Sequence, residues 1–260
     1  MQAVFNAKRE SNNHLFFMDW ENDSGVFSFH SQIELYFINE GEMEVFVDDC
    51  HTVLKKGEMS IALSYVPHGY KTPVSSASSA LIIPTHLCEK FVEETRRKKA
   101  VEPFIRDKET VEKIKDLFAR LRREGINEIE QLGYIYVILG IILDALSFEE
   151  KTEPPESSLA SRLLFYINEN YQKGISPADV AEHFNYSGSY ISRYFKKKFG
   201  ITLNKYLTVV KLKNAILLMQ EQKQSVTLCA LESGFGSTRS FYRAFYNEFG
   251  CSPSEYMSNK

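Results

Sequence analysis

Residues 176–200 read SPADVAEHFNYSGSYISRYFKKKFG, and residues 225–250 read SVTLCALESGFGSTRSFYRAFYNEFG. The two stretches share one pattern: Ala181 corresponds to Ala230 at an offset of 49 residues, and Phe195 corresponds to Phe245 at an offset of 50. The second copy therefore has one extra residue between its two expected helices. A repeat of two short helices predicts paired helix-turn-helix units, and such units indicate DNA binding.

The second helix of each copy is expected to bury one face and to present the other to base edges in the major groove. Ile191, Tyr194 and Phe195 form the inward face in the first copy, and Phe241 and Phe245 form it in the second. Arginine can bond guanine twice, serine can bond several bases, and lysine pairs with phosphate. The outward candidates for DNA contact are Ser189, Ser192, Arg193, Lys196, Thr238, Arg239, Tyr242 and Arg243.

The charge of the chain is divided unevenly along the sequence. The net charge is −3, but residues 159–260 hold 13 Lys and Arg against 7 Asp and Glu, a balance of +6. The remaining residues, 1–158, hold 18 basic and 27 acidic side chains, a balance of −9. This asymmetry is typical of a basic module that meets phosphates joined to an acidic module with another role. The lysine run 196–198 fits phosphate contact, and it equally fits a solvated surface.

A linker is predicted at residues 151–158, where adjacent prolines and small polar residues stop a helix and cannot pack a core. It separates a domain over 1–150 from a DNA-binding domain over 159–260, in which a long helix around residues 203–218 joins the two repeat units. The chain is long enough for two cores. We therefore expect a two-domain α+β protein.

The first domain is expected to hold a small β-sandwich or barrel over about residues 10–90, followed by a helical hairpin over about 105–148. Turn signals such as Asn39-Glu-Gly41 separate the short apolar runs that predict its strands. These runs are residues 15–17, 33–38, 43–47, 59–63 and 80–83. Apolar residues at steps of three and four predict a helix from about 111, and a second helix is expected from about 126 to 148.

The second of these helices is apolar on all sides over residues 134–143 and is too short to span a bilayer. It must bury several faces at once. It either covers the open side of the strands or contributes to a homodimer interface through the 110–148 helices, and both can hold together.

The rest of the sequence favours a cytoplasmic protein without a membrane segment. No apolar run approaches the roughly 20 residues that a spanning helix needs, and the N-terminus has no apolar signal core. The four cysteines, Cys50, Cys88, Cys229 and Cys251, stand far apart without metal-binding spacing, which favours reduced thiols.

The C-terminal half resembles the AraC/XylS transcriptional regulators over essentially all of residues 159–260. The most specific piece is Gly234-Phe235-x-Ser237-x-x-x-Phe241-x-Arg243-x-Phe245-x-x-x-Phe249-Gly250-x-Ser252-Pro253-x-x-Tyr256, which is similar to the family signature nearly position by position. The resemblance implies two helix-turn-helix units joined by a long helix. It also implies recognition-helix positions at Ser189, Ser192, Arg193, Thr238, Arg239 and Arg243. Lys211 and Cys229 depart from the family pattern, which commonly has arginine and isoleucine at these places.

The N-terminal half resembles, more weakly, the cupin barrel that is the usual sensory domain of this family. The resemblance rests on residues 30–41, on Gly57 and on Pro67-His68-Gly69-Tyr70. His30, Glu34 and His68, together with Gln32, are ligand types that suit a facial metal site. Ser28 stands where a full cupin metal motif has its first histidine, so we expect no metal and no other cofactor.

Three interpretations of these polar residues stay open: hydrogen-bonded side chains within a barrel, a metal site, and an effector pocket. The effector pocket would be formed by Phe29, His30, Glu34, Tyr36 and His68.

These observations lead to two alternative predictions of the function. The first is a sequence-specific transcription regulator, with no catalytic residues, whose first domain binds a small-molecule effector or mediates dimerisation. Double-stranded DNA is its partner, and RNA polymerase is an expected partner if it acts as an activator; the sequence does not distinguish activator from repressor. The alternative is a metal-dependent cupin enzyme with an appended DNA-binding domain, which would need a metal at His30, Glu34 and His68.

Overall fold

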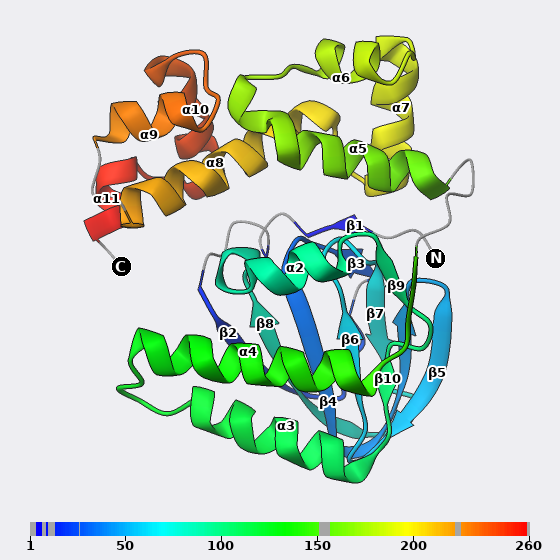
Figure 1. Cartoon of the computed structure of the whole chain (residues 1–260). Coiled ribbons are helices and arrows are strands. Elements are labelled where there is room, and N and C mark those ends of the chain that lie inside the picture. The colour runs from blue at the N-terminus through cyan, green and yellow to red at the C-terminus, as the bar shows by residue number, and fades with distance from the viewer. Residues whose placement is uncertain are drawn as a thin grey trace. The chain divides into compact units, whose positions relative to one another are not determined.

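The computed structural model describes residues 4–6, 9, 14–25, 27–150, 157–221 and 225–258. These residues form two compact units (Figure 1). The first unit contains the described residues of 14–150. The second contains 157–221 and 225–258, together with the described N-terminal residues 4–6 and 9, which include β1 (Val4–Phe5). The two-domain α+β architecture that the sequence predicts is confirmed.

An antiparallel sheet forms the first unit, and its strands are arranged around β4. The first half of β4 pairs with β6 and β8, and its second half pairs with β5 and β7. At the edges, β2 pairs with β8, β3 with β7, and β10 with β6. The strands are β2 (Phe16–Glu21), β3 (Ser28–Phe29), β4 (Ile33–Val47), β5 (Cys50–Lys55), β6 (Met59–Ala62), β7 (His68–Lys71), β8 (Ser76–Ile83) and β10 (Phe104–Ile105).

Strand β4 is one continuous strand where the sequence predicts two. The expected turn at Asn39-Glu-Gly41 is wrong, because the chain passes through this point with a β-bulge between Ile38 and Glu40. Gly41 has a φ of 71°, and a Cβ there would lie 2.1 Å from the carbonyl oxygen of Ser75. The glycine therefore lets the bulged strand lie close to its neighbour rather than ending it.

The two faces of β4 are both buried, and they belong to different cores. Ile33, Leu35 and Phe37 pack in a cluster with the helices that follow the sheet. Tyr36 and Ile38 point the other way, into a cluster with side chains of β5, β7 and β8. Since successive side chains of a strand alternate between faces, Glu34 is on the same face as Tyr36.

Two antiparallel helices cover the outer face of this sheet (Figure 1). Helix α3 (Lys108–Leu121) begins at Asp107, which accepts a hydrogen bond from the Thr110 amide at 2.9 Å. Helix α4 (Glu128–Ala145) begins at Asn127, which accepts from the Glu130 amide at 3.0 Å. Side chains at these caps satisfy amides that the helix leaves without partners.

Helix α4 ends at Ala145, before the predicted end at about residue 148. Phe148 instead begins strand β11 (Phe148–Glu150) and pairs with Ala100 of β9 (Lys98–Ala100). Several short elements were not predicted. They are β3, β5, β7, β9, β10 and β11, with the short helices η1 (Thr85–Leu87) and α2 (Glu89–Thr95). Short strands of this kind depend on partners far away in the sequence.

The second unit is helical. Its helices are α5 (Ser157–Asn170), η2 (Tyr171–Lys173), α6 (Pro177–His183), α7 (Gly188–Phe199), α8 (Leu203–Glu221), α9 (Val226–Glu232), α10 (Thr238–Phe249) and α11 (Pro253–Ser258). Helix α5 starts inside the predicted linker 151–158, of which residues 151–156 lie outside the described part of the chain. Among the described residues, no helix has both the length and the apolar character that crossing a membrane requires.

The extra residue of the second repeat lies in the turn between α9 and α10. In both copies an amide bonds back to the helix: Tyr186 N donates to Ala181 O at 3.0 Å, and Phe235 N donates to Ala230 O at 3.2 Å. These pairs are 49 residues apart, whereas the N-cap residues Ser187 and Ser237 are 50 apart. The insertion is therefore Gly236.

Both turns need a residue in the left-handed backbone region. Asn185 takes this place in the first copy with a φ of 58°, and Gly234 takes it in the second with a φ of 81°. Asparagine and glycine are the residues that adopt this conformation at low cost. At Gly234 the space is also closed, since a Cβ would lie 2.1 Å from the carbonyl oxygen of Tyr171.

We expect Gly234→Ala to destabilise the second unit by about 2 kcal/mol or more, because backbone strain and a clash with main chain add together. Gly236→Ala is the matched control: a Cβ there meets nothing within 4 Å, so the change should stay within about 0.5 kcal/mol. Urea unfolding followed by far-UV circular dichroism reports the helical unit, while fluorescence of Trp20, the only tryptophan, reports the first unit. Equal far-UV midpoints for the two variants would contradict this account of the turn.

Candidate DNA-binding surface and candidate effector site

Helices α7 and α10 begin and end in the same way, which makes them structural equivalents. Ser187 accepts a hydrogen bond from the Tyr190 amide, and Ser237 accepts one from the Ser240 amide, both at 3.2 Å. Each helix ends at a glycine in the left-handed region, Gly200 or Gly250. A residue of α7 therefore has its counterpart 50 positions later in α10.

The predicted inward faces are buried except at Tyr194, which is only partly buried. Ile191 and Phe195 are fully buried in α7, and Phe241 and Phe245 are fully buried in α10. The ring of Phe195 lies 5.4 Å from that of Tyr206 on the connecting helix α8. Apolar packing against α8 thus fixes how each helix is rotated about its own axis, and it determines which side chains face outward.

The predicted contact residues lie on the outward side of the two helices. Seven of them are exposed: Ser189, Ser192, Arg193, Lys196, Arg239, Tyr242 and Arg243. Thr238, the first residue of α10, is partly buried. Arg193 and Arg243 occupy equivalent positions, and Arg193 Nε donates to the Ser189 carbonyl at 3.2 Å, which holds that side chain along its helix. Their contact with DNA stays a prediction.

The two helices differ in charge at their C-terminal ends. Helix α7 carries Lys196, Lys197 and Lys198 in its last turn. The equivalent positions of α10 are Tyr246, Asn247 and Glu248, and Glu248 forms an ion pair with Lys205 of α8. The end of α7 thus offers three positive charges where the end of α10 offers a paired negative one.

Sequence reasoning missed a row of tyrosines beside the α7 contact residues. Tyr186 stacks on Tyr190 at 4.8 Å, and Tyr190 stacks on Tyr194 at 6.0 Å between ring centroids. Tyr186 and Tyr190 are exposed. Their spacing of four residues was the available signal, since side chains four apart share one helix face.

A cavity of about 500 Å³ lies between the start of α6, the N-terminal half of α8, and α10. Its lining includes the basic side chains Lys205, Lys211 and Arg243. Lys211 donates to the Ile175 carbonyl at 3.2 Å. Burial lowers the pKa of this lysine, and the nearby charge of Asp179 acts in the opposite direction. Lys211 therefore holds the chain just before α6 through its hydrogen bond to Ile175.

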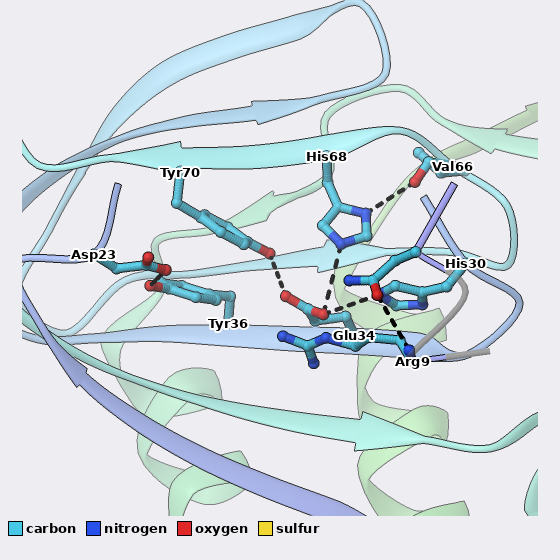
Figure 2. Close-up of polar contacts among 9 residues, drawn as sticks. Arg9, Asp23, His30, Glu34, Tyr36, Val66, His68 and Tyr70 are labelled. Atoms are coloured by element: carbon cyan, nitrogen blue, oxygen red, sulfur yellow. Dashed lines mark hydrogen bonds and ion pairs between the residues drawn. The ribbon is translucent and has the colours of Figure 1, made fainter. Parts of the chain in front are cut away.

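In the first unit, three of the predicted effector residues form one buried group (Figure 2). Glu34 of β4 faces His30 and His68: its Oε2 lies 3.2 Å from His30 Nε2 and 3.5 Å from His68 Nε2. The other oxygen, Oε1, accepts a hydrogen bond from the Tyr70 hydroxyl at 2.9 Å. All three predicted residues are at most 3% exposed.

Burial alone would raise the pKa of Glu34. The positive charge of His68 and the hydrogen bonds from both histidines outweigh it, and they hold the pKa of this carboxyl well below its usual range. Among the described residues, His30, Glu34 and His68 form a group that could hold a metal ion. Their contacts also fit a hydrogen-bonded cluster, so the structure leaves both interpretations possible.

Tyr36 lies next to this group rather than within it. Its hydroxyl bonds Asp23 at 2.8 Å and Ser78 at 2.7 Å, and its ring stacks on Tyr70 at 3.6 Å. Burial raises the pKa of the Tyr36 phenol. Phe29, the last residue of β3, is 1% exposed. Tyr70 links the two parts, and sequence reasoning did not assign it a role.

Residues 180–259 match the protein family described as a helix-turn-helix domain. The chain is 26% identical over 141 residues to the Msm operon regulatory protein of Streptococcus mutans, covering 54% of this chain and 51% of that protein. It is 22% identical over 247 residues to the melibiose operon regulatory protein of Escherichia coli, covering 87% and 82%. The chain thus spans about half the length of the first relative and most of the second.

Two solved structures illustrate a similar course of the chain. ToxT from Vibrio cholerae is 10% identical with a TM-score of 0.44, and the alignment covers 93% of this chain and 97% of ToxT. The AraC-like transcriptional activator CuxR is 16% identical with a TM-score of 0.44, covering 84% and 78%.

We expect Tyr36→Phe to destabilise the first unit by about 1–2 kcal/mol, because the partly buried Asp23 and the buried Ser78 lose a hydrogen-bond partner. Val74→Ala is the control, since Val74 is 83% exposed and lies outside the helices, and it should change stability by less than about 0.5 kcal/mol. Trp20 stacks on Tyr36 at 5.7 Å, so tryptophan fluorescence during urea unfolding is the measurement. Equal midpoints for both variants would show that the Tyr36 hydroxyl contributes nothing.

Proposed function

Since the chain belongs to the AraC-type transcription regulators, as its repeat and signature predict, we propose that it binds specific DNA sequences and that its first unit controls this activity. The observation that carries the proposal is the equivalence of α7 and α10. Both are anchored on α8 by buried aromatic residues, and both present an exposed arginine at the same position, Arg193 and Arg243.

Each helix-turn-helix would place its second helix, α7 or α10, in a major groove. Arg193 and Arg243 would bond guanine, while Ser189, Ser192, Thr238, Arg239 and Tyr242 reach base edges and backbone, and Lys196 pairs with phosphate. The two helix-turn-helix motifs of one chain would engage consecutive major grooves, about 34 Å apart along one face of the duplex.

The first unit is proposed to be a cupin-like barrel with an effector pocket formed by Phe29, His30, Glu34, Tyr36 and His68. What supports this is the convergence of polar groups in an otherwise apolar interior. Strand β4 connects the pocket with the helices α3 and α4. Glu34 faces the interior, and its neighbours Ile33 and Leu35 face the α3–α4 layer. A ligand that moves Glu34 would thus shift the packing of these helices.

Dimerisation is proposed to use the outer face of α4. Ile135, Ile138, Leu139 and Ile142 pack against the sheet, whereas Ile129, Tyr136 and Val137 are exposed. Gly133 and Gly140 lie on that same outer side, where a Cβ would meet nothing within 4 Å. Small residues between apolar ones allow another helix to approach closely, which favours a second copy of this helix.

We further propose that the chain is not an enzyme and that it works with RNA polymerase in the cytoplasm. Relatives named as operon regulators support this more than they support the cupin-enzyme alternative.

Arg193→Ala and Arg243→Ala should each weaken specific DNA binding by about 1–3 kcal/mol, because each removes a bidentate contact to a base. Lys173→Ala is the control, since Lys173 is an exposed basic residue of η2 outside both recognition helices. Operator fragments are selected from random DNA, and fluorescence anisotropy at fixed salt then measures affinity. Unchanged affinity of both arginine variants would reject the placement of the recognition helices.

Val137→Lys should dissociate the dimer, because a charge would enter an apolar helix contact. Val74→Lys is the matched control, since Val74 is an exposed valine of the same unit outside the helices. Sedimentation equilibrium measures the dimer dissociation constant, and we expect an increase of about 10-fold or more for Val137→Lys, equivalent to about 1.4 kcal/mol. A dimer that tolerates Val137→Lys as well as Val74→Lys would place the interface elsewhere.

A further inference from the structure

His30, Glu34 and His68 come from separate parts of the first unit and meet at one point (Figure 2). His30 precedes β4, Glu34 lies on β4, and His68 begins β7. One nitrogen of each histidine and one oxygen of the carboxylate lie within 4.8 Å of one another, and all three side chains are buried. The buried carboxylate of Glu34 is stable there only with a positive charge or a proton close to it.

The spacing of these atoms suits a shared metal ion. Ligand atoms that bind one ion at about 2.0–2.2 Å lie about 2.9–3.5 Å apart for tetrahedral or octahedral angles. The Glu34 oxygen lies 3.2 Å from the His30 nitrogen and 3.5 Å from the His68 nitrogen. Binding would bring the three atoms to these separations around the ion from within 4.8 Å of one another.

The hydrogen bond of His68 Nδ1 favours the same interpretation. This nitrogen lies 2.9 Å from the Val66 carbonyl oxygen, which can only accept, so Nδ1 carries a proton. In the neutral ring Nε2 then has a lone pair, and that lone pair faces the Glu34 carboxylate. A second proton on Nε2 makes the ring a donor to the carboxylate, and a metal ion bound to Nε2 would take the place of that proton.

The surrounding contacts orient the carboxylate as well. Tyr70 donates to Glu34 Oε1 at 2.9 Å, which leaves Oε2 directed at the histidines. Metal-binding histidines commonly donate their other nitrogen to a carbonyl, and metal-binding carboxylates are commonly hydrogen-bonded in turn. His68 with Val66, and Glu34 with Tyr70, have this arrangement.

The register of β3 and β7 explains how three ligands meet despite Ser28. The sequence lacks a histidine at position 28, and this gap was the reason to expect no metal. Ser28 pairs directly with His68 across the two strands. The histidine that is missing on β3 is thus replaced by one on the neighbouring strand, a relation that the linear sequence does not reveal.

We propose that His30, Glu34 and His68 bind a divalent transition-metal ion, and that this ion is part of the signal the first unit senses. The inference rests on the proposed effector site and names its chemical class. Two imidazoles and one carboxylate suit zinc, iron, cobalt or nickel, whereas magnesium and calcium prefer oxygen ligands alone. Three protein ligands leave further coordination positions for an effector with oxygen donors.

The test uses the full-length chain, stripped of metal with a chelator and titrated with Co²⁺. We expect one Co²⁺ per chain, visible ligand-field absorption, and displacement by Zn²⁺ but not by Mg²⁺. Glu34→Gln and His68→Ala should each weaken Co²⁺ binding by at least about 100-fold, because each removes a ligand. His51→Ala is the control, since His51 is exposed on β5, and it should bind Co²⁺ like the unmodified chain.

Trp20 fluorescence and far-UV circular dichroism verify that each variant is folded. If a variant does not fold, Co²⁺ titration of the unmodified chain decides, with NMR of the histidine rings identifying which rings shift. A folded chain that binds no Co²⁺, or that binds it equally well after Glu34→Gln, overturns the metal proposal. In that outcome the cluster is a proton-linked group of His68, Glu34 and His30.

The DNA measurement separates this inference from the proposed function. If Co²⁺ does not bind but Arg193→Ala and Arg243→Ala weaken operator binding, only the metal site is rejected. If Co²⁺ binds at Glu34 but neither arginine affects DNA affinity, the metal site stands and the assignment of the recognition helices falls.

Discussion

The alternation of side chains along β4 is the constraint on which the first unit depends. Both faces of the strand are buried, so a shift of one residue would place Glu34 among the helices and Leu35 in the polar interior. The pairing of β4 with β6 and β8 on one half, and with β5 and β7 on the other, prevents this shift. The same alternation places the Glu34 group one residue from the layer that carries α4, so one strand connects the proposed effector site with the proposed dimer interface.

In the second unit, a comparable constraint acts through backbone conformation. Each turn must change direction within a few residues, and the left-handed residues Asn185 and Gly234 provide the change. Gly236 lengthens the second turn by one residue, yet Ser237 still begins α10 as Ser187 begins α7. The cap and the buried aromatic residues therefore fix the recognition helix, while the turn tolerates an insertion.

Much of the second unit could be predicted because its signals are local. Caps such as Ser187, the spacing of Phe241 and Phe245, and the glycine after each helix all lie within a few residues of what they determine. The first unit depends on distant pairings. Asn39-Glu-Gly41 has the composition of a turn, yet the chain forms a β-bulge there and Gly41 lies close to Ser75. The contacts of Tyr70 with Glu34 and of Val66 with His68 depend on the pairing of β7 with β4. Position 28 could not be linked to His68 without the strand register.

The uneven charge at the ends of α7 and α10 has a kinetic consequence. Attraction between lysines and phosphates acts over roughly 10 Å at 0.1 M ionic strength, farther than any hydrogen bond. The end of α7, with Lys196 to Lys198, is therefore attracted to a duplex before the end of α10, where Glu248 is paired with Lys205. On the proposed DNA-binding function, the chain is held loosely through α7 while it moves along DNA, and α10 then docks only where the bases suit it. Raising the salt concentration would slow the first encounter through α7 more than it would weaken the binding of a docked α10.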